Sequence, residues 1–167
     1  MPMKSLILLL LFLAAPSLAE QPRLVFQQIQ VAIAHHDNRF SLRVWPDGRA
    51  EMRFPPYTTY AGHYQWQLDA DQLAMLDASL QAVAQLDLSG LQARKRSQAS
   101  SELIEIADAD WLRLEYRDDH QTQLQLVMES AQAWDSAMPG IRELAELAQL
   151  QATLFDWMLA AARELKQ

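Results

Sequence analysis

Apolar and polar residues alternate with a period of two early in the chain, in the stretch RLVFQQIQVAIAHH that begins at Arg23. Val25, Ile29, Val31 and Ile33 share one phase of this alternation, which is typical of a strand with one buried face. The pattern therefore predicts an early strand whose core side carries these residues.

The next stretch, FSLRVWPDGRAEMRF, predicts a β-hairpin. Pro46, Asp47 and Gly48 suit a type I turn closed by a glycine bulge, which makes a three-residue loop. This loop sets Val44 opposite Ala50 and keeps the apolar side chains on one face, whereas a register shifted by one residue would put charges into the core. Arg43 and Glu51 are expected to form a cross-strand ion pair on the outer face, which carries Ser41, Arg43, Trp45, Arg49, Glu51 and Arg53.

A further strand and a helix follow the pair of prolines that ends the hairpin. Residues 62–68 alternate again, and Asp69 with Gln72 has the signature of a capping box at a helix start. The helix is predicted to end at Gly90. Its buried stripe is expected to contain Leu73, Leu76, Leu80 and Val83.

The second half of the chain predicts a meander and a long helix. Residues 91–101 are polar and are expected to form a connection. Three strands are expected after it, in a register that sets Ile104 against Leu114, Ile106 against Leu112, Leu112 against Leu126, and Leu114 against Leu124. After Ser136 an apolar stripe of helical period predicts a helix to the end of the chain, lying either in the core or against a partner.

These elements predict an α+β fold. About seven strands in the order ββββα-βββα would form antiparallel sheet covered on one face by two helices. Residues 20–167 are expected to be a single domain, in which 20–90 form a first strand-helix block, 91–101 a connection and 102–167 a second block.

The segments FSLRVWPDGRAEMRF, AGHYQWQLDADQLAMLDASL and SSELIEIAD together resemble a class of small exported bacterial domains of uncharacterised function. The resemblance covers residues 38–150 and rests on turns and caps. It implies the same fold and supplies no catalytic residue or ligand. Those domains often follow a lipoprotein cysteine, which this sequence lacks.

Residues 1–19 have the pattern of a secretory signal peptide. An apolar run from Leu6 to Ala15 follows a single lysine, and small residues flank Leu18 as a cleavage site. This run is about ten residues, short of the roughly 20 that a membrane-spanning helix needs. We therefore expect cleavage near Ala19, no stable membrane anchor afterwards, and a periplasmic or secreted location.

The charge and the absence of cysteine narrow the function classes. The sequence has a net charge of −7, and loss of Lys4 with the signal peptide makes the mature chain more acidic still. An acidic chain has no electrostatic reason to bind nucleic acid. Since the sequence contains 0 cysteines, thiol catalysis, thiolate metal sites and disulfide scaffolds are excluded.

Histidines are the candidate metal ligands. On the predicted strand phase the adjacent His35 and His36 point to opposite faces, so they cannot share one ion. An alternative function is therefore a small-ligand or metal-binding periplasmic protein that uses His35 with His63 or His120.

Motifs for nucleophilic catalysis and for phosphate binding do not occur in the sequence. We therefore expect a protein without enzymatic activity and without a cofactor, and an unrecognised hydrolase is the second alternative.

Aromatic and arginine residues gather around the hairpin, and these residue types dominate interface hot spots. The sequence favours an exported, non-catalytic binding or accessory module, such as an inhibitor or immunity protein, whose partner is another protein. The predicted binding surface consists of Arg43, Trp45, Arg49, Arg53, Tyr57 and Tyr60.

Overall fold

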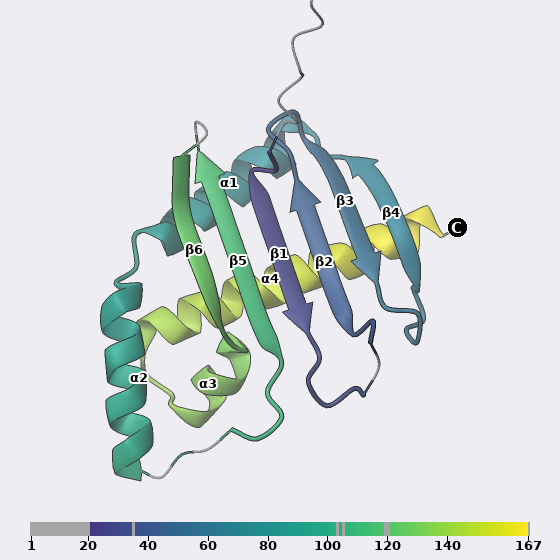
Figure 1. Cartoon of the computed structure of the whole chain (residues 1–167). Helices are drawn as coiled ribbons and strands as arrows, with labels where there is room; N and C mark the ends of the chain where they lie inside the picture. Colours follow the sequence, from purple (N-terminus) through teal and green to yellow (C-terminus); the bar gives the residue numbers. More distant parts are fainter. Residues whose placement is uncertain (1–20, 35, 103, 105, 119–120, 167) are drawn as a thin grey trace, which may run out of the picture.

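The structure, a computed structural model, describes residues 21–34, 36–102, 104, 106–118 and 121–166. These residues form a six-stranded antiparallel sheet with the strand order β4-β3-β2-β1-β5-β6 (Figure 1). The strands are β1 (Leu24–Ile29), β2 (Arg39–Val44), β3 (Arg49–Phe54), β4 (Gly62–Gln67), β5 (Trp111–Asp118) and β6 (Gln121–Glu129). The helices are α1 (Ala70–Ala84), α2 (Leu88–Glu102), α3 (Ala131–Ala137) and α4 (Arg142–Leu165).

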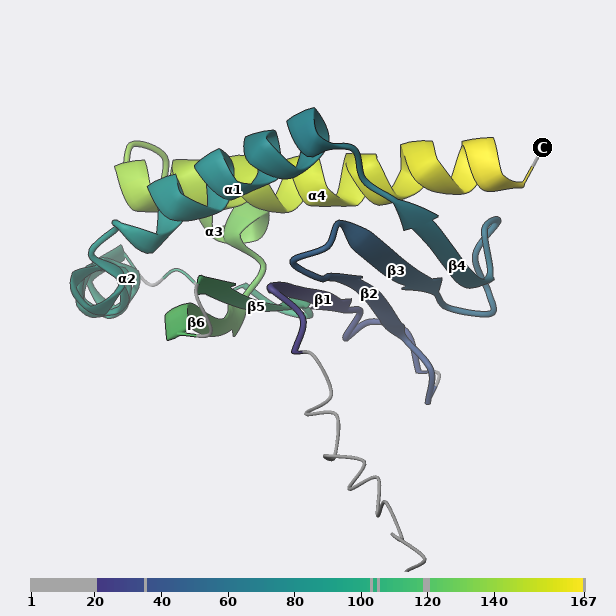
Figure 2. The same ribbon diagram turned by 90° about the horizontal axis from the view of Figure 1, so that it is seen from above.

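The predicted α+β class is confirmed, with six strands where about seven were expected and four helices where two were expected. Helices α1 and α4 lie across one face of the sheet, α3 lies between α4 and the β6 side of the sheet, and α2 lies beside β6 (Figure 2). No helix formed by the described residues covers the opposite face of the sheet. Within the described residues, no helix is both long and apolar enough to span a membrane.

The core fills the layer between the sheet and the helices. Helix α4 buries an apolar stripe along its length, with Leu144, Leu154 and Met158 almost completely covered. At its C-terminal half the ring of Phe155 meets that of Phe40 on β2 at a centroid distance of 5.1 Å. The sequence allowed this helix to lie either in the core or against a partner, and the structure places it in the core.

The hairpin β2–β3 forms in the predicted register. Val44 pairs with Ala50, Leu42 with Met52, and the Trp45 amide donates to the Arg49 carbonyl across the three-residue loop. Gly48 has φ +84, and a Cβ there would lie 2.9 Å from the Leu68 carbonyl oxygen, so both the conformation and the space require glycine. The predicted capping box of α1 is also present, since Asp69 and Gln72 exchange hydrogen bonds.

The predicted phase of the first strand is wrong. Leu24 and Phe26 point into the core at 0% exposure, whereas Val31 and Ile33 lie beyond the end of β1 and are exposed. The run Leu24 to Phe26 is apolar on both faces, so it carries no alternation that could identify the buried side. The core side continues with Gln28, whose amide donates to Asp110 at 2.7 Å.

The predicted three-stranded meander is also wrong. Among the described residues between α2 and β5, Ile104 and Ile106 are not in a strand, and Leu112 and Leu114 pair with Gln28 and Phe26 of β1. The register between β5 and β6 differs from the predicted one by two residues, with Leu114 opposite Leu126. A shift of two residues keeps the same side chains on the core face, so the alternation alone could not distinguish the two registers.

Helices α2 and α3 were not predicted. Helix α1 ends at Ala84 rather than at Gly90, and the expected connection 91–101 lies within α2. The polar composition of α2 hides its few anchors, which are the fully buried Leu91 and the buried Lys95. Tertiary contacts, not local periodicity, therefore decide these two helices.

Candidate binding surface on the open face of the sheet

The helix-free side of the sheet, here called the open face, is built from the alternate side chains of all six strands. One cross-strand row runs from Gln27 on β1 through Ser41 on β2 and Arg53 on β3 to His63 on β4. Since neighbouring strands lie about 4.8 Å apart, side chains within a row are in contact range of one another.

Arginine dominates the open face. It carries six arginines against the three glutamates Glu51, Glu115 and Glu129, in a chain whose net charge is −7. The arginines are Arg39, Arg43, Arg49, Arg53, Arg113 and Arg117. Helices α1 and α4 have the reverse balance, with six carboxylates and two arginines in their sequences. Basic and acidic residues are thus segregated on opposite sides of the molecule.

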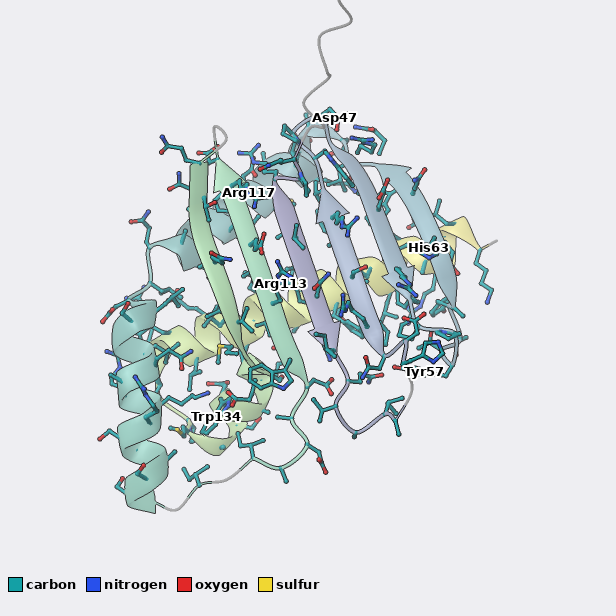
Figure 3. The ribbon with its side chains drawn as sticks, in the orientation of Figure 1. Asp47, Tyr57, His63, Arg113, Arg117 and Trp134 are labelled. Atoms are coloured by element: carbon teal, nitrogen blue, oxygen red, sulfur yellow. The ribbon has the colours of Figure 1, made fainter. Side chains whose placement is uncertain are left out.

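The two arginines on β5 share a carboxylate partner within the fold. Arg113 donates to Glu115 at 2.5 Å, and Arg117 contacts the other oxygen of Glu115 at 3.4 Å. Glu115 is buried between them, and Figure 3 shows Arg113 and Arg117 along the same strand. This part of the surface is an internal ion-pair network in which two guanidiniums share one carboxylate.

Two arginines of the hairpin also have partners. Arg53 forms an ion pair with Asp37 of the β1–β2 connection. The Arg49 guanidinium lies 4.3 Å from the centre of the Trp45 ring, a cation–π arrangement.

Arg39 and Arg43 differ from these, because neither guanidinium has a hydrogen bond or ion pair with any described residue. Both side chains are exposed. The expected ion pair between Arg43 and Glu51 does not form although the two residues are cross-strand partners, and Glu51 instead accepts a hydrogen bond from Gln65 at 3.0 Å. Two guanidinium groups are therefore available to an external anion.

Trp45 is not the exposed anchor that the sequence predicted. It is 8% exposed and lies beside the turn under the guanidinium of Arg49. Its ring supports Arg49 and offers little area to a partner, so the predicted surface keeps its arginines and loses its tryptophan.

The two predicted tyrosines lie in different environments. Tyr57 is 40% exposed, donates to Gln30 and lies at the end of the sheet (Figure 3). Burial raises the pKa of Tyr57, and the negative charges of Asp110 and Asp37 raise it further. Tyr60 instead packs on the core, with its ring 6.1 Å from that of Phe54, so it does not belong to the open face.

His63 is the one histidine of the proposed metal set that the structure describes. It lies exposed on β4, on the side away from the core (Figure 3). His35 and His120 lie outside the described residues. Within the described part of the chain, no three His, Asp or Glu side chains come together in a group that could hold a metal ion.

Sequence reasoning missed Arg39 and Gln27 as members of this surface. Arg39 lies two residues before Ser41, so the period of β2 could have placed it beside Arg43. Gln27 was assigned to the wrong face together with its strand, and no local signal could have corrected that.

Other depressions carry less chemistry. A groove between α1 and α4, of about 710 Å³, contains the already paired Arg142 and Glu146. A second groove between α2 and β6, of about 540 Å³, contains Lys95 and Glu129, which bind each other. The open face is therefore the strongest candidate, because its unpaired cations can bind an anion without breaking an internal contact.

Comparison of the chain with protein families, with curated proteins and with solved structures gives no match.

Proposed function

We propose that the protein is an exported, non-catalytic binding module that holds an acidic partner protein on its open face. The observation that carries this proposal is the pair of exposed guanidiniums of Arg39 and Arg43, which lack a counterion among the described residues of a net acidic chain. Export is proposed from the signal-peptide pattern of residues 1–19, which favours a periplasmic or secreted location.

The size of the open face supports a protein partner. Six strands at about 4.8 Å spacing and some six residues of about 3.3 Å each give a flat area on the order of 500 Å². This area is of the same order as the roughly 800 Å² that each partner contributes to a standard protein interface. Surface arginines of this kind steer an acidic partner and select against a basic one.

Charge reversal at Arg39 and Arg43 tests the proposal. Fluorescence anisotropy would compare a labelled ten-residue glutamate peptide with a ten-residue lysine peptide, at low and high salt. We expect the glutamate peptide alone to bind, with an affinity that falls as salt rises, and we expect R39E/R43E to weaken it at least tenfold, which is about 1.4 kcal/mol.

A double variant on α4, R142E/R163E, is the matched control because it changes the same net charge on the helical side. Equal loss of binding in both double variants would mean that net charge, not the open face, attracts the peptide. Preference for the lysine peptide would overturn the proposal.

A further inference from the structure

A small hollow lies near the middle of the open face, with a short side chain surrounded by long ones. Ser41 is flanked along β2 by Arg39 and Arg43, and across the sheet by Gln27 and Arg53. These side chains and His63 line a depression of about 160 Å³. The hollow exists because serine fills little of the space that its neighbours enclose.

The volume of the hollow limits what it can hold. It corresponds to roughly five waters at about 30 Å³ each. Pockets for drug-sized ligands are larger, at roughly 300–1,000 Å³. The hollow therefore fits one functional group of a larger partner.

Gln27 adds an unpaired amide to the lining of the hollow. Its side chain lines the hollow and the residue is only 7% exposed, yet its amide makes no hydrogen bond to any described residue. Fully buried amides are normally paired, whereas the Gln27 amide atoms are not fully buried and reach water through the hollow, so a ligand there can take the place of that water. Gln28, the next residue, follows this rule with its bonds to Asp110 and Gln151 on the other face.

The charges around the hollow select the ligand. Arg39, Arg43 and Arg53 supply three positive charges, while Glu51 and the Asp37 bound to Arg53 supply two negative ones. Among these arginines and carboxylates, the balance of one positive charge suits a single carboxylate better than a doubly charged phosphate. Guanidinium groups bind carboxylates through paired, parallel hydrogen bonds.

We infer that this hollow is a carboxylate site, in which the guanidiniums of Arg39 and Arg43 bind the two oxygens and the Gln27 amide and Ser41 hydroxyl donate further hydrogen bonds. The inference rests on the proposed function for the identity of the partner, since an acidic protein would place an aspartate, a glutamate or its terminal carboxylate here.

NMR titration of the purified protein would test the site directly. The probes are acetyl-Glu-Glu-Glu-amide for side-chain carboxylates, acetyl-Gly-Gly-Gly with a free carboxyl end for a terminal carboxylate, acetyl-Gln-Gln-Gln-amide as the neutral control, and inorganic phosphate. We expect one or both carboxylate peptides to shift the side-chain amide signals of Gln27 in a saturable way, and the two peptides distinguish the source of the carboxylate. The neutral peptide should leave these signals in place.

Two variants separate binding from folding. Q27M should weaken carboxylate binding at least fivefold without lowering Tm, because the amide has no partner inside the fold to lose. S41I should fill the hollow and abolish the shifts, while R163Q on α4 should bind as the parent does. The Tm of each variant shows whether a loss of binding comes from unfolding.

Several results would overturn the inference. Tighter binding of phosphate than of both carboxylate peptides would assign the hollow to another ligand. Unchanged binding in Q27M and S41I, with the arginine dependence of the ten-residue glutamate peptide intact, would overturn the hollow and leave the proposed function standing. Loss of that arginine dependence would overturn the proposed function itself.

Discussion

At the residue scale, one electrostatic contact is imperfect, the one between Arg23, which precedes β1, and Asp77 of α1. Arg23 Nε lies 3.0 Å from Asp77 Oδ1, yet both atoms are buried without a hydrogen bond, because the N–H is not directed at the oxygen. Arg23 directs another nitrogen to Asp118 at 3.1 Å. Burial raises the pKa of Asp77; the charge of Arg23 lowers it and that of Asp118 raises it again, with a net rise.

The raised pKa of Asp77 predicts a pH-dependent effect of D77N. An acid with a raised folded-state pKa stabilises the fold fully below its unfolded pKa, and this contribution is lost as pH rises through the folded pKa. The charged form of Asp77 therefore lowers the stability of the fold at neutral pH. At pH 7 we expect the free energy of unfolding of D77N to equal that of the parent or to exceed it by up to about 1 kcal/mol. This difference should disappear near pH 3, where Asp77 of the parent is protonated.

Urea unfolding at both pH values measures this difference. D71N, at an exposed aspartate of the same helix, is the control and should show no such dependence. A variant D77N that is clearly less stable than the parent at pH 7 would show that the Arg23 contact outweighs the cost of burial.

At the element scale, α2 depends on one polar anchor. The Lys95 ammonium lies 2.5 Å from Glu129 at the end of β6 and 4.2 Å from the centre of the Trp134 ring. Burial raises the pKa of Glu129, but hydrogen bonds from Lys95, its own backbone and Trp134, together with the Lys95 charge, hold it below its usual value. This cluster joins a polar helix to the sheet and to α3.

Removal of the Lys95 ammonium should release α2 before the rest of the protein. We expect K95M to speed amide hydrogen exchange across residues 88–102 by at least tenfold, with the amides of β1 and β2 unchanged, because leaving Glu129 partly buried without its cation costs about 1–3 kcal/mol. Hydrogen exchange followed by mass spectrometry measures this.

R96M is the matched control, since Arg96 is exposed and bonds only to a backbone carbonyl of its own helix. Because the pKa of Glu129 is lowered in the fold, its stabilising contribution exists above its unfolded pKa and is lost as pH falls through the folded one. The protection factors of the α2 amides, which correct for the intrinsic pH dependence of exchange, should thus fall toward acid pH in the parent, and a flat profile of protection factors would contradict the role given to Lys95.

The sequence predicted those elements whose signals are local. The Pro46 to Gly48 turn determines the β2–β3 register through its own backbone, and Asp69 with Gln72 caps α1 without any distant partner. The phase of β1 and the existence of α2 depend on residues far along the chain, such as Leu114 and Glu129. The candidate site follows the same division, since Arg43 and Arg53 were found from the hairpin, whereas Gln27 needed the phase of β1.

At the scale of the whole molecule, the N-terminal strand joins the two halves of the chain. β1 pairs with β2 on one side and with β5 on the other, so the sheet cannot be divided between residues 20–90 and 102–167. The two strand-helix blocks of the sequence prediction consequently share one sheet. Pairing of β1 with β5 spans most of the chain, which predicts slow formation of the complete sheet.

A fragment of residues 20–90 should therefore not fold by itself. It keeps β1 to β4 and α1 but loses β5 and α4, which leaves Leu24 and Phe26 without most of their cover. We expect no near-ultraviolet circular dichroism and no cooperative urea transition from this fragment, in contrast to the full chain. A cooperative transition in the fragment would show that the first block is autonomous.

Segregation of charge gives the molecule a permanent electric dipole that points across its thickness, from the acidic helical layer to the arginines of the sheet. In the electric field of a negatively charged surface, a molecule with this dipole rotates before contact. The sheet therefore meets that surface first, even though the net negative charge of the molecule is repelled by it at long range. Orientation and attraction thus act over different distances. Ionic strength decides which of them acts on an approaching partner, because salt screens electrostatic forces beyond about 10 Å at 0.1 M.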